Sequence, residues 1–171
     1  MPQKSTIAEG DQDRVAIFLG PDSALNVQRT IIGFGEILSE QFTLDLITTN
    51  PDALPDEIDS FYNIYGSKST TTFRGGYRAL NSYLETTDPI VLTYITRPPT
   101  TGTIAALLAK RHDVPFLYRH SGETFRDYTL FSGYSKARLF VLKNIVGQVP
   151  LKLATKYISL GPAGKYQLVD Q

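Results

Sequence analysis

The residues with the clearest potential for chemistry lie in the run Val114–Phe125. The run begins as an apolar strand and then changes to small and polar residues, which are His120, Ser121, Gly122 and Glu123. In an open α/β sheet, ligands bind in the crevice outside the carboxyl ends of the strands. A histidine at that position can donate a hydrogen bond to a ligand hydroxyl or transfer a proton. A purely structural role for His120 stays open, and no Gly-x-Ser-x-Gly motif supports a serine hydrolase.

Three other short motifs resemble ligand-binding sequences but lack the usual context. Asp11-Gln12-Asp13 has the form of a metal-binding pair, yet it precedes the first predicted strand and is expected in a solvated tail. Gly33-Phe34-Gly35 falls inside a predicted helix, whereas a dinucleotide fingerprint opens one. The turn at 161–165 has its glycines too close together for a phosphate loop, although its amides could meet an anion. We therefore expect no metal site and no cofactor, and we expect His112 to be structural at a helix end.

An aromatic and basic segment follows the polar run. Its aromatic side chains recur every three residues, at Phe125, Tyr128, Phe131 and Tyr134. The basic side chains that accompany them are Arg126, Lys136, Arg138, Lys143 and Lys152. Core packing is the default expectation for the aromatic residues. The alternatives are an apolar patch beside the crevice that receives a sugar ring or a lipid, and an interfacial helix that makes peripheral contact with a membrane. Nucleic-acid binding is not expected, because no recognised module is present.

Length and composition indicate one domain. The chain has 171 residues, of which 42% are apolar. We expect a flexible tail over residues 1–13 and a single domain over residues 14–171. No signal peptide or transmembrane helix is expected, because the first residues are polar and the longest apolar run, Ile104–Ala109, is far shorter than the roughly 18–20 residues that a span needs. The absence of cysteine excludes disulfides and thiol chemistry and favours a cytoplasmic location.

Charge is unevenly distributed along the chain although the net charge is zero. Residues 1–96 carry 6 Lys and Arg against 13 Asp and Glu, a net charge of −7. Residues 97–171 carry 11 against 4, a net charge of +7. Either the two halves of one fold neutralise each other, or the basic half forms a face for an anionic partner such as phospholipid or nucleic acid.

Short apolar runs that alternate with helical patterns predict the elements that position these residues. The predicted strands are Arg14–Gly20, Phe42–Thr49, Phe61–Tyr65, Pro89–Ile95, Val114–Tyr118 and Tyr157–Leu160. Helical spacing of apolar residues predicts helices around 27–38, 77–84, 104–108 and 139–153, with a further one at 162–170, and Pro150 is expected to kink or break the fourth. Tyr77 and Leu107 are expected on the apolar faces of their helices, and the acidic, proline-containing segment 50–60 is expected as an exposed loop. Strands that alternate with helices predict an α/β fold with a doubly wound, mainly parallel sheet and helices on both faces, as in Rossmann-like domains.

The order and spacing of these elements resemble the N-terminal, acceptor-side domain of GT-B glycosyltransferases of family 4. Arg14–Gly20 looks like the first strand of that domain, and Pro89–Thr96 resembles its D-x-V-x-x-H strand. Val114–Gly122 is similar to the family element VPxVxxxHG. Tyr157–Gly164 resembles the strand and turn that introduce the last helix before the interdomain linker. The resemblance covers the chain from about Arg14 to Gln171.

The resemblance implies half of a retaining, metal-independent glycosyltransferase that takes a sugar from a nucleotide-sugar donor to a glycan or lipid-linked acceptor. His120 would contact the transferred sugar, and Gly20, Pro21 and Asp22 would lie near the donor phosphates. The other implied substrate contacts are Thr96, Arg97, Ser121, Gly122 and Glu123 at the cleft, and Phe125, Arg126 and Tyr128 toward the acceptor. The donor-binding C-terminal domain with its Glu-x7-Glu motif is missing from this chain, which is therefore expected to be inactive alone.

The chain also departs from the family pattern. Pro21 replaces the second glycine of the first loop, and Thr96 and Arg97 stand where a histidine is expected. Two other functions stay open beside the transferase. One is a non-catalytic α/β module that binds a small polar ligand or a protein in the same crevice, and the other is an adaptor at a membrane surface.

Overall fold

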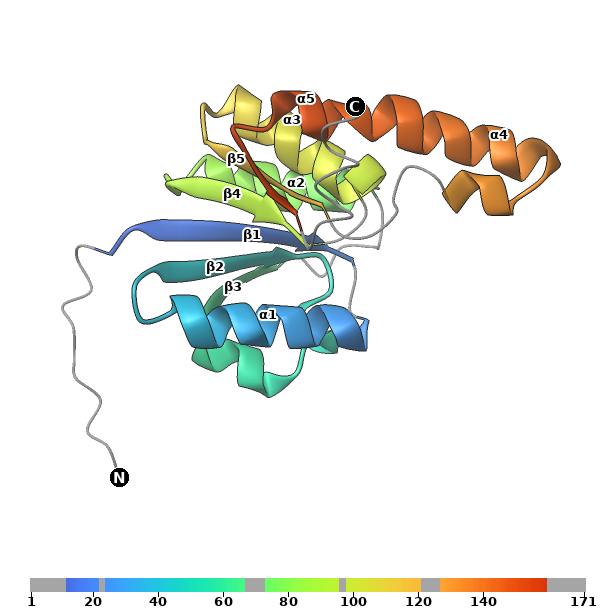
Figure 1. Ribbon diagram of the computed structural model, residues 1–171. Helices are drawn as coiled ribbons and strands as arrows, with labels where there is room; N and C mark the ends of the chain where they lie inside the picture. The colour runs from blue at the N-terminus through green and yellow to red at the C-terminus, as the bar shows by residue number, and fades with distance from the viewer. Residues whose placement is uncertain (1–11, 22–23, 67–72, 96–97, 121–126, 160–171) are drawn as a thin grey trace.

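The computed structural model describes residues 12–21, 24–66, 73–95, 98–120 and 127–159. Within these residues the chain forms one six-stranded sheet of order β3-β2-β1-β4-β5-β6 (Figure 1). Its strands are β1 (Arg14–Gly20), β2 (Thr43–Thr48), β3 (Tyr62–Gly66), β4 (Val91–Tyr94), β5 (Phe116–His120) and β6 (Lys156–Ser159). All five neighbouring pairs are parallel. The predicted doubly wound, Rossmann-like α/β fold is confirmed.

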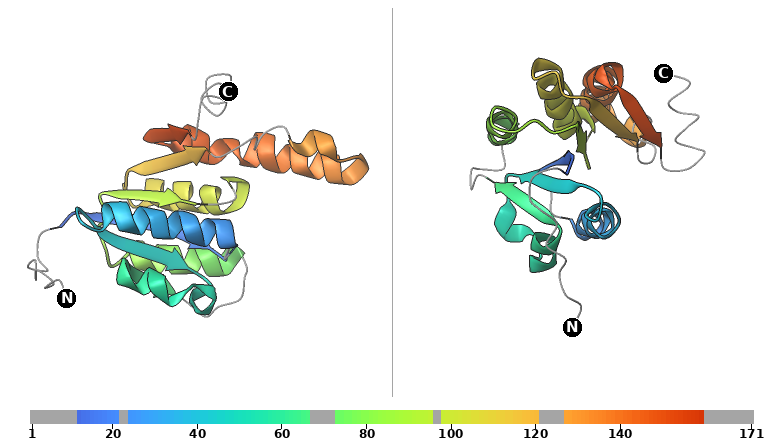
Figure 2. Two further views of the ribbon diagram at one scale, coloured as in Figure 1. Left: turned by 60° about the horizontal axis from the view of Figure 1, so that its bottom comes forward. Right: turned by 90° about the vertical axis from the view of Figure 1, so that its left-hand side faces the viewer.

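Helices cover both faces of the sheet unequally. The helices are α1 (Leu25–Leu38), α2 (Phe73–Leu84), α3 (Thr103–Arg111), α4 (Gly133–Val141) and α5 (Gln148–Leu153). Helix α1 lies on one face, over β1 and β2, while α2, α3 and α5 lie on the other (Figure 2, right). The crossovers from β3 to β4, β4 to β5 and β5 to β6 therefore all pass over one face.

The first strand shows why its sequence is a continuous apolar run. Ala16 and Phe18 point into the cluster beneath α2 and α3, whereas Ile17 and Leu19 point into the cluster beneath α1. Successive side chains of a strand alternate between faces, and a central parallel strand is buried on both. All four side chains are at most 1% exposed.

Three sequence expectations about exposure were wrong. Leu107 was expected on the apolar face of its helix but is 49% exposed, because α3 is enclosed by α2, α5 and the sheet and leaves Leu107 as an outward position. Tyr77, also expected on an apolar face, is 37% exposed and receives a hydrogen bond from Arg111. The segment 50–60 was expected as an exposed loop, yet it forms two 3-10 turns, Pro51–Ala53 and Asp56–Ser60, and buries Ile58 beneath α1.

The expected interruption of the long apolar helix occurs before Pro150. Helix α4 widens into the π-helical turn η5 (Leu142–Val146), and α5 begins after Gly147. Pro150 lies in the first turn of α5. Backbone N–H groups of a first helical turn have no intrahelical partner, so proline costs little there. The break is therefore set by the wide turn at 142–146 and not by the proline.

Gly35 allows a close approach between α1 and the segment before β3. A Cβ atom built on Gly35 would lie 2.7 Å from the Cβ and Cγ atoms of Phe61. We therefore expect Gly35→Ala to lower the free energy of unfolding by about 1–3 kcal/mol through overpacking. Gly33 in the same helix has open space around its Cα. We expect Gly33→Ala to be neutral or to stabilise by about 0.5–1 kcal/mol, since alanine is the better helix former. Urea unfolding of both variants measures the difference, and equal stability would contradict the close contact.

Candidate functional site

The carboxyl ends of β1, β4 and β5 form the candidate site. The strand order reverses between β1 and β4, because successive strands are added to one side of β1 up to β3 and to the other side from β4 onward. Open α/β sheets bind ligands outside the carboxyl ends of the strands at such a switch point. Gly20 ends β1 and His120 ends β5, with β4 between them. Both residues therefore lie at the same edge of the sheet.

Gly20 makes the turn out of β1 with φ of +68°, a conformation that favours glycine. Its carbonyl oxygen accepts hydrogen bonds from the Thr48 hydroxyl and the Thr49 amide, each at 3.0 Å. A Cβ atom at this position would lie 3.4 Å from Oγ1 of Thr101. The end of β1 is thus tied to the end of β2 and approached closely by the turn η3 (Pro98–Gly102) after β4. Pro21 is half-buried beside it.

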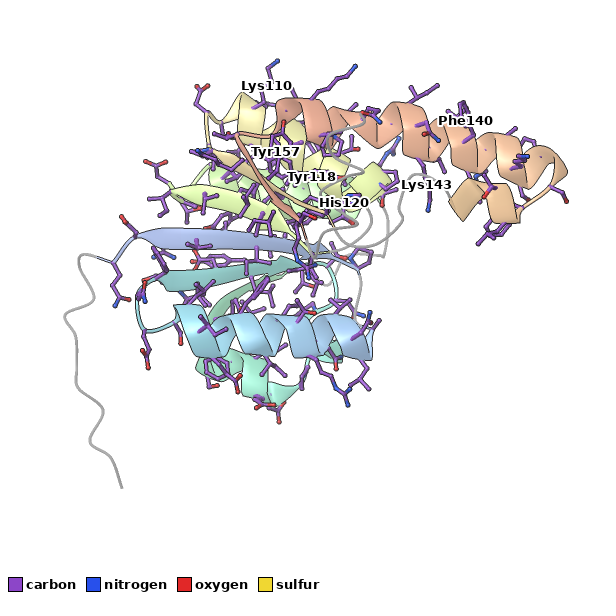
Figure 3. All side chains as sticks on the ribbon, viewed as in Figure 1. Lys110, Tyr118, His120, Phe140, Lys143 and Tyr157 are labelled. Atoms are coloured by element: carbon purple, nitrogen blue, oxygen red, sulfur yellow. The ribbon has the colours of Figure 1, made fainter. Side chains whose placement is uncertain are left out.

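The sequence predicted that His120 follows the strand, but the structure shows that His120 belongs to β5. It is the last residue of the strand, opposite Ser159 of β6, and it is fully buried. The imidazole ring stacks on Tyr118 with the ring centres 6.1 Å apart and the planes at 20°. Figure 3 shows both side chains on β5 at the carboxyl edge. The histidine is held in a fixed orientation by its aromatic neighbour and by strand pairing.

An aromatic cluster packs next to the His120 ring. Tyr94 of β4 stacks on Phe116 at 5.9 Å and meets Tyr118 edge-on at 5.8 Å. Tyr157 of β6 packs on Tyr118 with the ring centres 6.3 Å apart. The Tyr94 hydroxyl donates to the carbonyl oxygen of Arg119 at 3.1 Å. Burial raises the pKa of Tyr94 and of Tyr118, so both phenols are neutral at physiological pH.

Arg119 is a charged residue at this edge that the sequence reading did not single out. It points to the face opposite His120, where its Nη1 donates to the carbonyl oxygen of Ile95 at 3.2 Å and its guanidinium lies 5.7 Å from the centre of the Phe34 ring. Burial lowers its pKa, but a guanidinium stays protonated in proteins. Its Nε is buried without a hydrogen-bond partner among the described residues. The signal in the sequence was a cation inside the otherwise apolar strand.

Most of the other predicted site residues lie outside the described residues. These are Asp22, Thr96, Arg97, Ser121, Gly122, Glu123, Phe125 and Arg126, together with the turn at 161–165 and Asp11. The backbone of Tyr128 is described as part of the 3-10 turn η4 (Asp127–Leu130), but its side chain is not. The structure therefore brings together Gly20, Pro21 and His120 from the predicted set and adds Arg119.

The later part of the aromatic segment corrects one expectation. Phe131 and Tyr134 were expected in the core, but they are 50% and 82% exposed. The reason is that η4 and α4 extend beyond the sheet, so no strand lies beneath these two residues (Figures 1 and 2). By contrast, His112 caps the end of α3 as predicted, with Nε2 3.2 Å from Oδ1 of Asn81.

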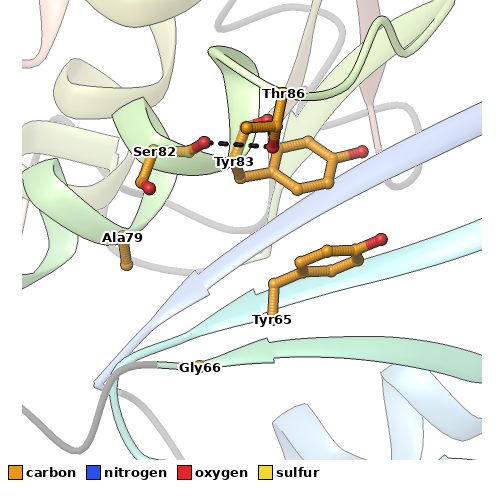
Figure 4. Close-up of a pocket in the computed structure, with 6 residues that line it drawn as sticks. All are labelled: Tyr65, Gly66, Ala79, Ser82, Tyr83 and Thr86. Carbon is orange, nitrogen blue, oxygen red and sulfur yellow. Dashed lines mark hydrogen bonds between the residues drawn. The ribbon is translucent and has the colours of Figure 1, made fainter.

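A pocket of about 220 Å³ lies elsewhere, between the edge strand β3 and helix α2 (Figure 4). It is lined by Tyr65, Gly66, Ala79, Ser82, Tyr83 and Thr86. The Tyr83 hydroxyl donates to Asp45 at 2.6 Å, and Thr86 donates to the carbonyl oxygen of Ser82 at 3.3 Å. These polar groups already serve the fold, and the pocket is at the edge of the sheet opposite β5 and β6.

The described ranges contain neither a metal cluster nor a membrane-spanning helix. No group of three or more histidine, aspartate or glutamate side chains could hold a metal ion there. In the same part of the chain, every helix is too short or too polar to cross a bilayer.

Comparison with known proteins supports the fold. No protein-family model and no curated protein sequence matches the chain. Among solved structures, a protein assigned as a UDP-N-acetylglucosamine 2-epimerase from Listeria monocytogenes is similar with a TM-score of 0.62 and 14% identity over 94% of this chain and 42% of its own. A second UDP-N-acetylglucosamine 2-epimerase gives a TM-score of 0.61 and 13% identity over 94% of this chain and 45% of its own. The glycotransferase of kitacinnamycin gives a TM-score of 0.53 and 14% identity over 89% of this chain and 47% of its own.

This chain spans less than half the length of each of these proteins. At such low sequence identity the similarity concerns the fold. The residues described here therefore form a Rossmann-like α/β unit of the kind that makes up one half of a GT-B fold.

Proposed function

We propose that this chain is the acceptor-side half of a sugar-processing enzyme of the GT-B type, namely a retaining, metal-independent glycosyltransferase that uses a nucleotide sugar. The observation that carries the proposal is the position of His120, which is the only histidine at the carboxyl edge of the described sheet. His120 ends β5, and β5 is separated from β1, which ends at Gly20, by β4 alone. The similarity in fold to enzymes named for sugar-nucleotide chemistry and for glycosyl transfer supports it.

In this proposal the imidazole of His120 donates a hydrogen bond to a hydroxyl of the transferred sugar. Its ring is already fixed by Tyr118, and groups that are preorganised in this way act without reorganising during the reaction. Because the ring is fully buried in this structure, the sugar must displace part of what covers it. Glu123, Arg97, Thr96, Ser121 and Gly122 complete the sugar contacts.

In this proposal the donor phosphates and the acceptor are contacted by different residues. Residues 20–22 face the phosphates of the nucleotide sugar, most of which is bound by a second domain. Arg119 adds a permanently positive charge at the same edge of the sheet. Phe125, Arg126 and Tyr128 contact the glycan or lipid-linked acceptor.

A second candidate function is epimerisation of a nucleotide sugar. It is favoured by one observation, which is that two epimerases give TM-scores of 0.62 and 0.61, whereas the epimerase from Methanocaldococcus jannaschii and the glycotransferase both give 0.53. The two reactions differ in their products. A transferase releases the nucleotide and lengthens the acceptor, whereas an epimerase returns a nucleotide sugar of the same mass with one inverted carbon.

The test uses the whole polypeptide of the native source in which this chain occurs. It is incubated with a panel of nucleotide sugars, with and without acceptors, and the products are followed by mass spectrometry and NMR. We expect His120→Asn to lower kcat about 100-fold or more, because proton transfer or a hydrogen bond in the transition state contributes at least this factor. His112→Asn, at the other end of the sheet, is the matched control and should keep full turnover.

Circular dichroism and the melting temperature check that the buried His120→Asn variant is folded. Turnover within about threefold of the native protein in a folded variant would refute the role of His120. Saturable binding of a nucleotide sugar or small ligand without any product would favour the non-catalytic binding module instead.

A further inference from the structure

Residues 129–146 form an extension that we call the projecting arm. It contains the end of η4, all of α4 and the turn η5. Figures 1 and 2 show α4 reaching past the carboxyl ends of the strands, away from the sheet. Every residue from Thr129 to Arg138 is exposed. The arm is therefore a surface element that the core of the protein leaves uncovered.

The projecting arm exposes large apolar side chains. They are Leu130, Phe131, Tyr134, Phe140, Val141 and Ile145. Leu130 and Tyr134 are each 82% exposed, and Ile145 is 59% exposed. A soluble monomer rarely exposes a contiguous apolar surface without an interaction to cover it. The apolar content of the arm therefore points to a partner.

The charge of the arm identifies the kind of partner. Lys136, Arg138 and Lys143 are its charged side chains, and no aspartate or glutamate occurs anywhere between Asp127 and Asp170. Lys136 and Arg138 are exposed, and Lys143 is partly exposed. The partner must therefore tolerate apolar insertion and carry negative charge.

Helical spacing mixes the two kinds of side chain on the same surface. Tyr134, Arg138 and Val141 follow one another at intervals of four and three residues, which places them along one line of α4. Lys136 and Phe140 form a second line at an interval of four. Helices that lie in a membrane interface combine apolar and aromatic insertion with lysine and arginine that reach the headgroups.

We propose that the projecting arm binds the surface of a bilayer that contains anionic phospholipid. Pairing of two arms in a dimer is disfavoured by this charge, because it would bring like charges together. A nucleic acid matches the charge but not the exposed leucine, phenylalanine and isoleucine. An anionic bilayer matches both features, since its headgroups attract the cations and its acyl region takes up the apolar side chains.

Membrane contact through the arm would also orient the candidate site. Figure 3 shows Phe140 and Lys143 of the arm on the side of the molecule toward which the carboxyl end of β5, with His120, points. A bilayer bound there would lie near the entrance to the crevice. This orientation, and a lipid-linked acceptor delivered from the bilayer, rest on the proposed function, whereas binding to the bilayer does not.

The test measures binding of the whole protein to vesicles of phosphatidylglycerol and phosphatidylcholine in equal parts, with pure phosphatidylcholine vesicles for comparison. We expect co-sedimentation with the anionic vesicles that weakens as salt is added. The chain has no tryptophan, so Tyr134→Trp provides a single fluorescent reporter. Its emission should shift to shorter wavelength with anionic vesicles if the arm inserts.

Two variants separate the contributions of charge and of apolar insertion. Lys136→Glu with Arg138→Glu should weaken binding roughly 25-fold or more, at about fivefold per lost cation. Leu130→Ser with Tyr134→Ser should also weaken binding while the charge stays the same. The matched control is Arg29→Glu with Lys110→Glu, which makes the same change of charge on the exposed surfaces of α1 and α3 and should bind as the native protein does.

Several outcomes would overturn the proposal. They are equal binding to neutral and anionic vesicles, unchanged binding of the arm variants, and an unshifted Tyr134→Trp emission. A native dimer that the arm variants dissociate, detected by light scattering without any vesicle binding, would instead assign the arm to contact between copies of the chain. None of these readouts depends on enzyme activity, so failure here is distinguishable from failure of the proposed reaction.

Discussion

Replacing Asp45 by alanine is expected to lower the free energy of unfolding by about 2–4 kcal/mol, because it leaves the buried Tyr83 hydroxyl without its acceptor and the partly exposed Arg14 without its counterion. Asp45 lies in the middle of β2 and is fully buried. Nη1 of Arg14 contacts its two carboxylate oxygens at 2.7 and 2.9 Å. The side-chain amide of Asn63 donates a hydrogen bond to the same carboxylate at 3.0 Å. The Tyr83 hydroxyl also donates to this carboxylate, at 2.6 Å. All of these donors would lose their acceptor at once.

Urea unfolding at neutral pH measures the loss. Asp45→Asn keeps the shape of the side chain but removes the charge, so its cost should be smaller than that of alanine. Asp59→Asn, on the exposed turn Asp56–Ser60, is the matched control and should change stability by no more than about 0.5 kcal/mol. A loss below about 1 kcal/mol for Asp45→Ala would mean that the network contributes little to the fold.

A steep loss of stability above pH 10 is the second large effect that we expect. Burial is the largest cause of a raised pKa at Tyr62, Tyr83, Tyr94 and Tyr118, and the hydrogen bond to Asp45 raises the pKa of Tyr83 further. Their unfolded value is 10.0. Below pH 10 these phenols are protonated in both states, so they give no pH dependence there.

Above pH 10 the unfolded chain releases these protons while the folded protein keeps them, so the unfolded state is favoured. Each such tyrosine lowers the free energy of unfolding by about 1.4 kcal/mol per pH unit, and four lower it by roughly 5 kcal/mol per unit. Because a domain of this size is stable by about 5–15 kcal/mol, it should unfold within roughly one to three pH units above 10.

Urea unfolding between pH 8 and the alkaline transition, with tyrosinate absorbance as a second readout, tests this expectation. Tyr62→Phe should reduce by one the number of protons released on unfolding, and so make the dependence of the free energy of unfolding on pH less steep. The substitution also removes the hydrogen bond from the Tyr62 hydroxyl to the carbonyl oxygen of Ile31 at 2.8 Å. If all tyrosines ionised near pH 10 in a protein that stayed folded, the burial of these four phenols would be contradicted.

The local patterns of the sequence were sufficient for the elements and for the fold class. Arg14–Gly20 was predicted as a buried strand with the bounds that β1 has, because its apolar residues are continuous and end at a glycine. The other strands were found to within a few residues for the same reason. Alternation of strands with helices then leaves few arrangements other than a parallel sheet.

The end of β5 shows where local patterns stop being informative. The apolar run ends at Tyr118, and the sequence therefore placed Arg119 and His120 beyond the strand. The structure extends β5 because β6 pairs with it, opposite Ile158 and Ser159. The pairing partner lies about forty residues away in the chain, and no local pattern reports it. The edge of the sheet was predicted, but the burial of His120 was not.

Long-range partners also decided the roles of Asp45 and of the projecting arm. Asp45 is 31 residues from Arg14 and 38 from Tyr83, so its network exists only in the folded chain. Phe131 and Tyr134 are aromatic residues of the kind that usually pack in a core. They are exposed because the projecting arm extends past the sheet (Figure 1). Periodicity is local, so the amino-acid sequence was enough to show which segments form strands and helices. Which faces are covered and which charges meet depends on segments far apart in the chain, so these features become visible only in the folded protein.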